Sequence, residues 1–298
     1  MKTLVLLTVL LVSILLFSLL TSAQTALQVV VVGVDGLGGE ALRKIPTTTF
    51  ASLIKTGAYT LHARAVLPTV SSPNWASMIM GAGPEQHGVT SNDWKPDKFE
   101  IAPVSTGTGR IFPTIFSVVK QQRPEATIGI FHDWDEFGRL TERNIGSVIE
   151  DADGPADAIR RSLSFIRATT PALTFIHLDH VDHAGHEHGW FSPEYESAIK
   201  EADRLLKELI DGIKASGSWD RTVLLLTADH GGVGTKHGGM STAEIEIPWI
   251  LHGPGVVKGV ELKTPINTYD TAPTLAHIMG VRPHEAWIGK PVREALTR

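Results

Sequence analysis

Apolar residues along the chain gather into short continuous runs that are rich in valine, isoleucine and leucine. These runs cover residues 27–34, 127–131, 172–178, 222–227 and 248–251. Continuous apolar runs of this kind are typical of strands that are buried on both faces of a parallel sheet. Segments with helical spacing of apolar residues lie between them, at residues 49–56, 74–80, 112–120, 156–168, 193–216 and 271–279. The alternation predicts an α/β fold with a doubly wound, mostly parallel sheet and helices on both faces.

The N-terminal segment differs from the rest of the chain. Lys2 precedes an apolar run over residues 4–20, and Thr21, Ser22 and Ala23 follow it. This pattern predicts a secretory signal peptide over residues 1–23, and therefore a secreted or periplasmic protein. The apolar run is long for a signal peptide, so the alternative is an uncleaved segment that anchors the protein to a membrane. No linker divides the remainder, and we expect residues 24–298 to form a single domain.

Composition narrows the choice of function. The 298 residues include no cysteine and have a formal net charge of -5. The absence of cysteine excludes disulfides and cysteine-ligated zinc, and the mild acidity gives no basic surface for nucleic acid. Nothing in the composition defines an oligomeric state. The segment 91–110 follows neither apolar pattern, and we expect it to be a long excursion over one edge of the sheet.

Carboxylates and imidazoles follow directly after the predicted strands. Asp35 follows the run 27–34, and Asp229 and His230 follow 222–227, with His237 shortly after. The run 172–178 is followed by the segment DHVDHAGHEHG, which contributes Asp179, His180, Asp182, His183, His186 and His188. Ligands of open α/β sheets bind beyond the carboxyl ends of the strands. Clustered carboxylates repel one another without a cation, and a mixed Asp/His set of this size suits two divalent ions, zinc or else manganese or iron.

The segment LPTVSSPNWASM, residues 67–78, places three hydroxyls before an apolar helical run: Thr69, Ser71 and Ser72. One interpretation is an ordinary helix N-cap. The other is a nucleophile, because a hydroxyl bound to a metal loses its proton easily. Local spacing leaves both open.

Together these motifs resemble the alkaline phosphatase superfamily, and within it the type I phosphodiesterase/nucleotide pyrophosphatase family. The resemblance rests on five segments in the right order. They are VVGVDGLGG, LPTVSSPNWASMIMGAGPEQHGV, DHVDHAGHEHG, LLLTADHGG, and KHGG with IPWILHGPGV. It implies an alkaline-phosphatase-like catalytic domain that is similar to the family over almost all of residues 24–298.

The resemblance assigns the site residue by residue. It implies that Ser71 is the nucleophile, while Ser72 is expected to be the helix N-cap before Pro73, and Thr69 to pack at a strand end. One metal ion would be held by Asp35, Ser71, Asp229 and His230. The second would be held by Asp182, His186 and His237. Asp179, His180, His183 and His188 have no metal role in the family and are expected to lie around the site.

The resemblance also implies how substrate is held. Asn74 matches the family amide that donates to a phosphate oxygen, and Trp94 or Trp134 is expected to stack on an aromatic or nucleobase group. No arginine adjoins Ser71, which favours a diester over a monoester dianion, unless a distant Lys95 or Arg139 folds over the site. The residues of a sulfatase signature are absent after Pro73.

The expected function is hydrolysis of phosphodiester or pyrophosphate bonds in a small phosphate ester or nucleotide, through a covalent phosphoserine. The alternatives are a phosphomonoesterase or phosphotransferase of the same superfamily, and an inactive metal-binding recognition protein.

Overall fold

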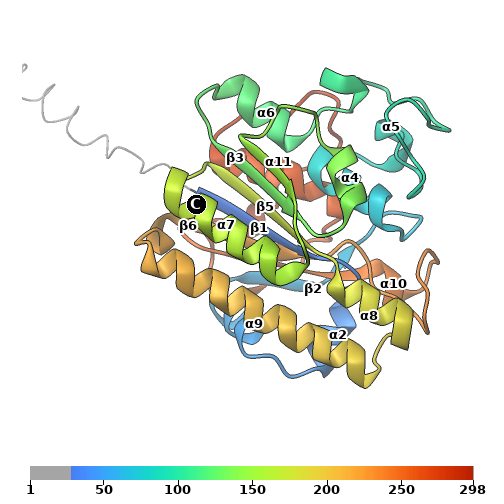
Figure 1. The fold of residues 1–298 in the computed structure, drawn as a ribbon, viewed down its shortest axis with the longest axis vertical. Helices are drawn as coiled ribbons and strands as arrows, with labels where there is room; N and C mark the ends of the chain where they lie inside the picture. The colour runs from blue at the N-terminus through green and yellow to red at the C-terminus, as the bar shows by residue number, and fades with distance from the viewer. Residues whose placement is uncertain (1–27, 298) are drawn as a thin grey trace, which may run out of the picture.

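A computed structural model describes residues 28–297. Within these residues, the strands form one mixed sheet: β1 (Gln28–Val34), β2 (Ala58–Arg64), β3 (Ile128–His132), β4 (Val148–Asp151), β5 (Leu173–Leu178), β6 (Thr222–Thr227), β7 (Glu246–His252) and β8 (Val260–Glu261). Their order is β4-β3-β5-β1-β6-β7-β2-β8. The five strands β4, β3, β5, β1 and β6 are parallel to one another, whereas β7 runs antiparallel to both of its neighbours, β6 and β2. The predicted α/β fold with a mostly parallel sheet is confirmed (Figure 1).

Helices cover both faces of the sheet, as predicted. They are α2 (Gly39–Lys44), α3 (Thr49–Thr56), α4 (Ser71–Met80), α5 (Pro84–His87), α6 (Ile115–Gln122), α7 (Pro155–Thr169), α8 (His180–His188), α9 (Pro193–Ala215), α10 (Thr242–Ile245) and α11 (Thr271–Met279). Helix α7 packs on β3 and β5, with α9 beside it, and α4, α6 and α11 pack together on the opposite face (Figure 1). The indole of Trp75 on α4 lies so close to Gly33 of β1 that a Cβ there would approach it to 2.4 Å.

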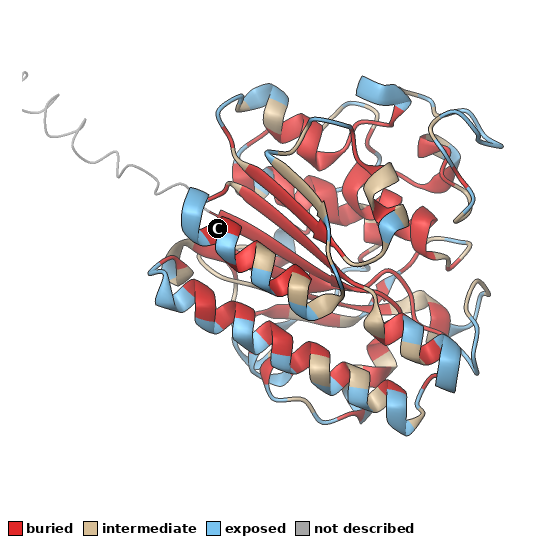
Figure 2. Ribbon diagram, in the orientation of Figure 1, coloured by how far each residue is buried: buried red, intermediate tan, exposed pale blue. Residues whose placement is uncertain are grey.

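The core follows the apolar runs. Strands β1, β3, β5 and β6 are buried along their whole length, as Figure 2 shows for the middle of the sheet. The predicted segments correspond to β1, β3, β5, β6 and β7, and to α3, α4, α6, α7, α9 and α11. The pattern missed β2 and β4, which are partly exposed, and β8, which is exposed. Edge and half-exposed strands carry polar residues and so lack a continuous apolar run.

The start of α4 corrects one expectation. The helix begins at Ser71, and the N-cap position is Val70, which has no side-chain cap. Ser72 therefore lies inside the first turn, where its Oγ is buried and has no hydrogen-bond partner among residues 28–297. Ser72 is not the N-cap, because the helix begins two residues earlier than a first helical position at Pro73 would imply.

Two expectations concern the ends and edges of the domain. The predicted signal peptide, residues 1–23, lies outside the described residues. Among the residues that the structure does describe, none of the helices has the length and apolar character needed to span a membrane. The segment 91–110 contains only an isolated bridge between Lys95 and Lys98 and a short turn at Thr108–Arg110, in agreement with its lack of apolar periodicity.

Candidate active site

The sheet order brings three ligand-bearing strand ends together. Strand β1 lies between β5 and β6, so Asp35, Asp179 and Asp229 all follow adjacent parallel strands. The Gly36 N–H donates to Asp229 Oδ1 at 3.1 Å and ties the ends of β1 and β6 together. Gly36 has φ +70, and a Cβ there would come within 2.7 Å of the Asp182 backbone. Only glycine allows this turn and this close approach of α8.

The first cluster lies at the N-terminus of α4. Asp35, Asp229 and His230 place ligand atoms within 4.8 Å of one another. His230 Nε2 lies 3.1 Å from Asp229 Oδ2 and 3.5 Å from Asp35 Oδ1. Ser71 Oγ lies 3.2 Å from the same His230 nitrogen, and Ser71 is 5% exposed. The structure thus brings together all four residues that the sequence assigned to one ion.

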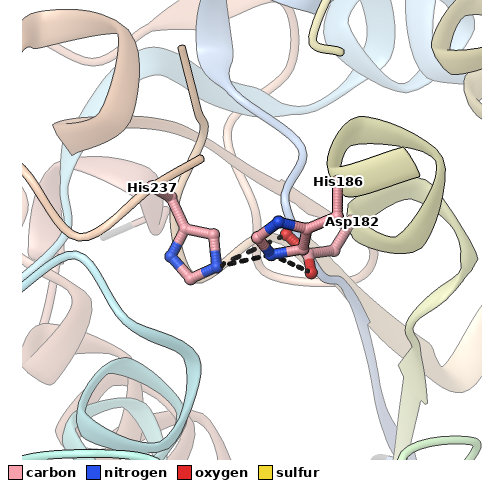
Figure 3. Close-up of side chains that lie close together, drawn as sticks. All are labelled: Asp182, His186 and His237. Atoms are coloured by element: carbon pink, nitrogen blue, oxygen red, sulfur yellow. Dashed lines mark hydrogen bonds and ion pairs between the residues drawn. The ribbon is translucent and has the colours of Figure 1, made fainter. Parts of the chain in front are cut away.

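The second cluster comes from α8 and the loop after β6. Asp182 and His186 lie one turn apart on α8, and His237 reaches them from the opposite side (Figure 3). His186 Nε2 is 3.3 Å from Asp182 Oδ2 and 3.0 Å from His237 Nε2. The rings of His237 and His230 stack with centroids 3.8 Å apart, which places the two clusters side by side.

Backbone carbonyls orient the histidines of both clusters. Nδ1 of His186 contacts Thr235 O at 3.0 Å, and Nδ1 of His237 contacts Thr69 O at 2.8 Å. His230 Nδ1 contacts Gly231 O at 3.0 Å. Because a carbonyl only accepts, each Nδ1 carries the proton and each Nε2 presents a lone pair. The Nε2 atoms of His186 and His237 therefore face each other as two lone pairs, an arrangement that a cation between them stabilises.

Buried carboxylate oxygens in the two clusters also lack partners. Asp35 Oδ1, Asp182 Oδ1 and Asp229 Oδ2 accept no hydrogen bond within the described part of the chain. Burial and the charge of Asp35 raise the pKa of Asp182 and of Asp229 well above the usual range. Buried anionic oxygens without donors are unfavourable, and a divalent cation supplies the missing charge. The donor set therefore fits metal ions, and the mixture of aspartate and imidazole suits zinc, manganese or iron.

The pKa of His230 also suits a metal ligand. Burial and the neighbouring His237 lower the pKa of His230 to about 3. The ring is therefore neutral near pH 7, which is the form that binds metal.

The sequence did not identify His177, which supports the first cluster. His177 Nε2 donates to Asp35 Oδ2 at 3.1 Å, and its Nδ1 lies 3.5 Å from Asp133 Oδ1. Burial opposes the protonated form of His177, but the two carboxylates outweigh it and raise its pKa to about 9. Trp75 Nε1 donates to the same Asp35 oxygen at 2.8 Å. The available signal was a histidine inside an otherwise apolar strand.

The expected role of Asn74 is corrected. Its side chain is fully buried, and Nδ2 donates to the backbone carbonyls of Val66, Pro68 and Val70. Its Oδ1 accepts from the Val66 N–H at 2.6 Å. With these bonds made, the amide holds the loop before α4 and has no group left for a phosphate oxygen.

A second asparagine, Asn92, lies beside the nucleophile. Asn92 Oδ1 accepts from the Ser72 N–H at 2.8 Å, while its Nδ2 makes no hydrogen bond to the described residues. The Arg139 guanidinium donates to the Asn92 carbonyl and fixes the backbone there. No lysine or arginine in the described chain forms a hydrogen bond or ion pair with Ser71 or either cluster. Asn92 could not be identified from the sequence, because the excursion that carries it has no apolar periodicity.

The remaining predicted residues divide between core and surface. Trp94 is 4% exposed, so the expectation that it stacks on substrate is corrected. Trp134 is half-buried, and its ring lies 6.0 Å from that of His177. Asp179 places a ligand atom within 4.8 Å of Asp35 and His177, whereas His180 Nε2 contacts Ala198 O on α9.

Comparison with known proteins identifies the family. The model of the family described as type I phosphodiesterase/nucleotide pyrophosphatase matches residues 29–246, which include both clusters and Ser71. The chain belongs to this family. The family comprises hydrolases, and the resemblance drawn from the five sequence segments is confirmed.

The curated relatives share between 24% and 32% sequence identity with this chain over the matched segments. Human ectonucleotide pyrophosphatase/phosphodiesterase family member 5 is 24% identical over 74% of this chain and 49% of its own length. Mouse family member 1 is 25% identical over 59% of this chain and 20% of its own length. Zebrafish (Danio rerio) arylsulfatase K is 32% identical over 29% of this chain and 18% of its own length. The chain thus spans between about a fifth and a half of these relatives.

Solved structures show the same fold. Murine ectonucleotide pyrophosphatase/phosphodiesterase 5, as an inactive variant in complex with AMP, has a TM-score of 0.76 and 18% identity. The match covers 91% of this chain and 100% of that one. A mutant of the alkaline phosphatase PafA has a TM-score of 0.75 and 12% identity, over 91% of this chain and 99% of that one. The predicted alkaline-phosphatase-like fold is confirmed.

Proposed function

We propose that the protein is a two-metal phosphohydrolase that cleaves diesters or pyrophosphates of small phosphate compounds, with nucleotides as the first candidates. The observation that carries the proposal is the position of Ser71 Oγ, 3.2 Å from His230 Nε2 and next to buried carboxylate oxygens that lack donors. The family and the AMP complex of the murine structural neighbour support the substrate class.

The proposed ligand sets follow the two clusters. Asp35, Ser71, Asp229 and His230, all buried, would hold one ion, and Asp182, His186 and His237 would hold the other. Bound divalent ions supply positive charge that lowers the pKa of a coordinated hydroxyl and stabilises oxygen atoms on phosphorus. Zinc fits this donor set best, with manganese or iron as alternatives.

The chain's own residues perform the proposed reaction. Ser71 gives its Oγ proton to solvent water and attacks phosphorus, so that the Oγ–P bond forms while the bond to the leaving oxygen breaks, and the leaving oxygen departs with the electron pair of that bond and is protonated by water. Water then cleaves the Oγ–P bond and restores the hydroxyl. The backbone N–H groups and dipole at the N-terminus of α4 favour the negative charge of the phosphate, and Asn92 Nδ2 donates to a non-bridging oxygen. Asn92 takes the role first expected of Asn74.

Substrate preference follows from the charges around Ser71. The Arg139 guanidinium donates to the Asn92 carbonyl, and none of the lysines and arginines in the described residues forms a hydrogen bond or ion pair with Ser71 or either cluster. The second negative charge of a monoester dianion therefore has no cationic side chain to pair with. A diester monoanion, which lacks that charge, loses little by comparison. Trp134 offers an aromatic surface for the second ester group.

The test is kcat/KM for an aryl phosphodiester and the matching monoester, with the same leaving group, one pH and zinc-loaded protein. We expect the diester to be cleaved faster. A tenfold advantage for the monoester, about 1.4 kcal/mol in transition-state binding, would reject the diesterase assignment.

One relative favours group transfer as a second candidate. GPI ethanolamine phosphate transferase 1 of Yarrowia lipolytica is 26% identical over 67% of this chain and 22% of its own length. A transferase would pass the phosphoryl group from Ser71 to an alcohol. Its signature would be a product ester that increases with added alcohol while release of the first leaving group stays constant.

A further inference from the structure

The two carboxylate oxygens of Asp35 have different surroundings. Oδ2 accepts hydrogen bonds from His177 Nε2 at 3.1 Å and from Trp75 Nε1 at 2.8 Å. Oδ1 accepts none from the described residues and lies 3.5 Å from His230 Nε2. A carboxylate that two donors hold through one oxygen keeps its orientation as long as both bonds are made. Oδ1 is therefore the oxygen that is directed at the first cluster.

His177 lies among apolar and aromatic side chains. It belongs to β5, which is buried along its whole length, and is itself fully buried. Its ring packs against those of Trp75 and Phe137, with centroids 4.8 and 5.1 Å away. Burial of an imidazole is unfavourable without hydrogen bonds, so an apolar side chain would serve better if packing were its whole role. What distinguishes His177 from such a residue is its pair of ring nitrogens.

Asp133 lies on the other side of the His177 ring. Asp133 Oδ1 is 3.5 Å from His177 Nδ1 and accepts the Asp179 N–H at 2.7 Å. Asp179 directly precedes α8, the helix that carries two ligands of the second cluster. The contacts from Asp133 through His177 to Asp35 therefore connect the start of that helix to the first cluster.

A direct role for His177 as a metal ligand is the alternative, because its ring, Asp35 and Asp179 place ligand atoms within 4.8 Å of one another. The hydrogen bonds argue against this role. Nε2 donates to Asp35 and so carries the hydrogen, whereas a nitrogen that binds metal presents a lone pair. Nδ1 faces a carboxylate oxygen of Asp133, which also favours a bound hydrogen.

We propose that His177 is a positioning residue for the metal site that contains Ser71. Together with Trp75 it fixes Asp35 so that only Oδ1 reaches the ion, and Asp133 keeps the His177 ring in place. The proposal rests on the proposed function, in which Asp35 is a metal ligand. Without the His177 donor the carboxylate is free to turn, and loss of a group that orients a metal ligand lowers metal affinity about 10–100-fold.

The test compares two substitutions of His177. His177→Phe keeps an aromatic ring but removes the donor, whereas His177→Gln keeps an N–H donor near the position of Nε2. His87→Phe is the matched control, because His87 is also a buried histidine. Its hydrogen bonds, to Ser77 and Val89, involve no residue of the two clusters.

Two measurements on the folded variants report the metal site directly. Competition with a chelator gives zinc affinity and stoichiometry, and the visible absorption of cobalt-loaded protein reports the coordination of the bound ions. We expect His177→Phe to bind one of two zinc ions about 10–100-fold more weakly and to change the cobalt spectrum. We expect His177→Gln and His87→Phe to resemble the wild type in both.

Three results would overturn the proposal. They are wild-type zinc affinity and cobalt spectrum in His177→Phe, equal weakening in His177→Gln, and loss of a third zinc ion, which would make His177 a ligand. Thermal unfolding shows whether each variant is folded. If His177→Phe is not, Trp75→Phe removes the other donor to Asp35 Oδ2 and carries the same expectation and the same refutation. A wild type whose zinc binding depends on His177 but which cleaves no diester would contradict only the proposed function.

Discussion

Of the two asparagines near Ser71, Asn74 was expected to bind phosphate, and Asn92, for which no role was expected, is the one to which we now assign it. Asn74 lies in the family segment, but its side-chain amide is hydrogen-bonded to backbone groups. Asn92 lies in an irregular loop, and its Nδ2 makes no hydrogen bond to the described residues. Sequence position identified the segment but not which amide reaches the site, because the answer depends on how a distant loop folds back onto α4.

Substitution by alanine should therefore affect mainly activity at Asn92 and mainly stability at Asn74. Asn92→Ala should lower kcat/KM for an aryl phosphodiester by about 10²–10³, as loss of one donor to a developing oxyanion does. Its loss of stability should be smaller than that of Asn74→Ala, because only the Ser72 N–H loses its acceptor. Asn74→Ala should reduce the free energy of unfolding by roughly 2–4 kcal/mol, because it leaves buried backbone groups of the 66–70 loop without partners.

Steady-state kinetics and urea unfolding of both variants test this pair. Equal loss of stability in the two variants, or full activity of Asn92→Ala, would contradict the assignment of Asn92 to phosphate.

At the scale of elements, Trp190 connects α8 to the end of β1. Its Nε1 donates to the Gly36 carbonyl at 2.9 Å, and Tyr195 of α9 donates its hydroxyl to the same carbonyl at 2.9 Å. The Trp190 ring also meets the His186 ring edge-to-face at 5.4 Å. The indole fits beside Gly185 and Gly232, where a Cβ would approach it to 2.8 and 2.3 Å. These contacts fix the distance between the two clusters.

Removing the indole donor should weaken metal binding. Trp190→Phe should reduce zinc affinity about 10–100-fold, as loss of groups that orient metal ligands does. Tyr195→Phe removes the other donor to the Gly36 carbonyl but leaves the contact between Trp190 and His186 intact, so the loss of zinc affinity should be smaller. Competition with a chelator measures both, and a larger effect of Tyr195→Phe would show that the carbonyl, rather than the histidine, matters.

Elements were predictable where burial is uniform. Strand β1 and helix α9 follow from apolar runs and apolar spacing, because both bury a continuous surface. Helix α8 was not among the predicted helical segments, because most of its residues are polar and follow no apolar spacing.

At the scale of the whole molecule, the site is a product of sheet order. Asp35, Asp182 and Asp229 are far apart in sequence and meet because β1 lies between β5 and β6. The sequence predicted this convergence from the rule that ligands bind at the carboxyl ends of strands. It did not predict His177, whose contacts with Asp35 and Asp133 depend on the packing between β5 and the loop after β3.

Because each cluster contains buried carboxylate oxygens that accept no hydrogen bond from the described residues, metal should stabilise the fold. Chelation should lower the thermal unfolding midpoint, and zinc should restore it. At a free zinc concentration 100 times its dissociation constant, each site adds about 2.7 kcal/mol to the free energy of unfolding. Differential scanning calorimetry of the chelated and reloaded protein measures the shift, and an unchanged midpoint would contradict metal binding at the buried clusters.

The central claim is that Ser71 is the nucleophile, and its neighbour Ser72 provides the control. Both are buried serines in the first turn of α4, but Ser72 Oγ has no partner, whereas Ser71 Oγ faces His230. The decisive measurement is kcat/KM for an aryl phosphodiester, with zinc content, in Ser71→Ala and Ser72→Ala. We predict that Ser71→Ala loses activity by orders of magnitude while Ser72→Ala retains most of it, both remaining folded with zinc bound. An active Ser71→Ala, or an inactive Ser72→Ala, would contradict the account.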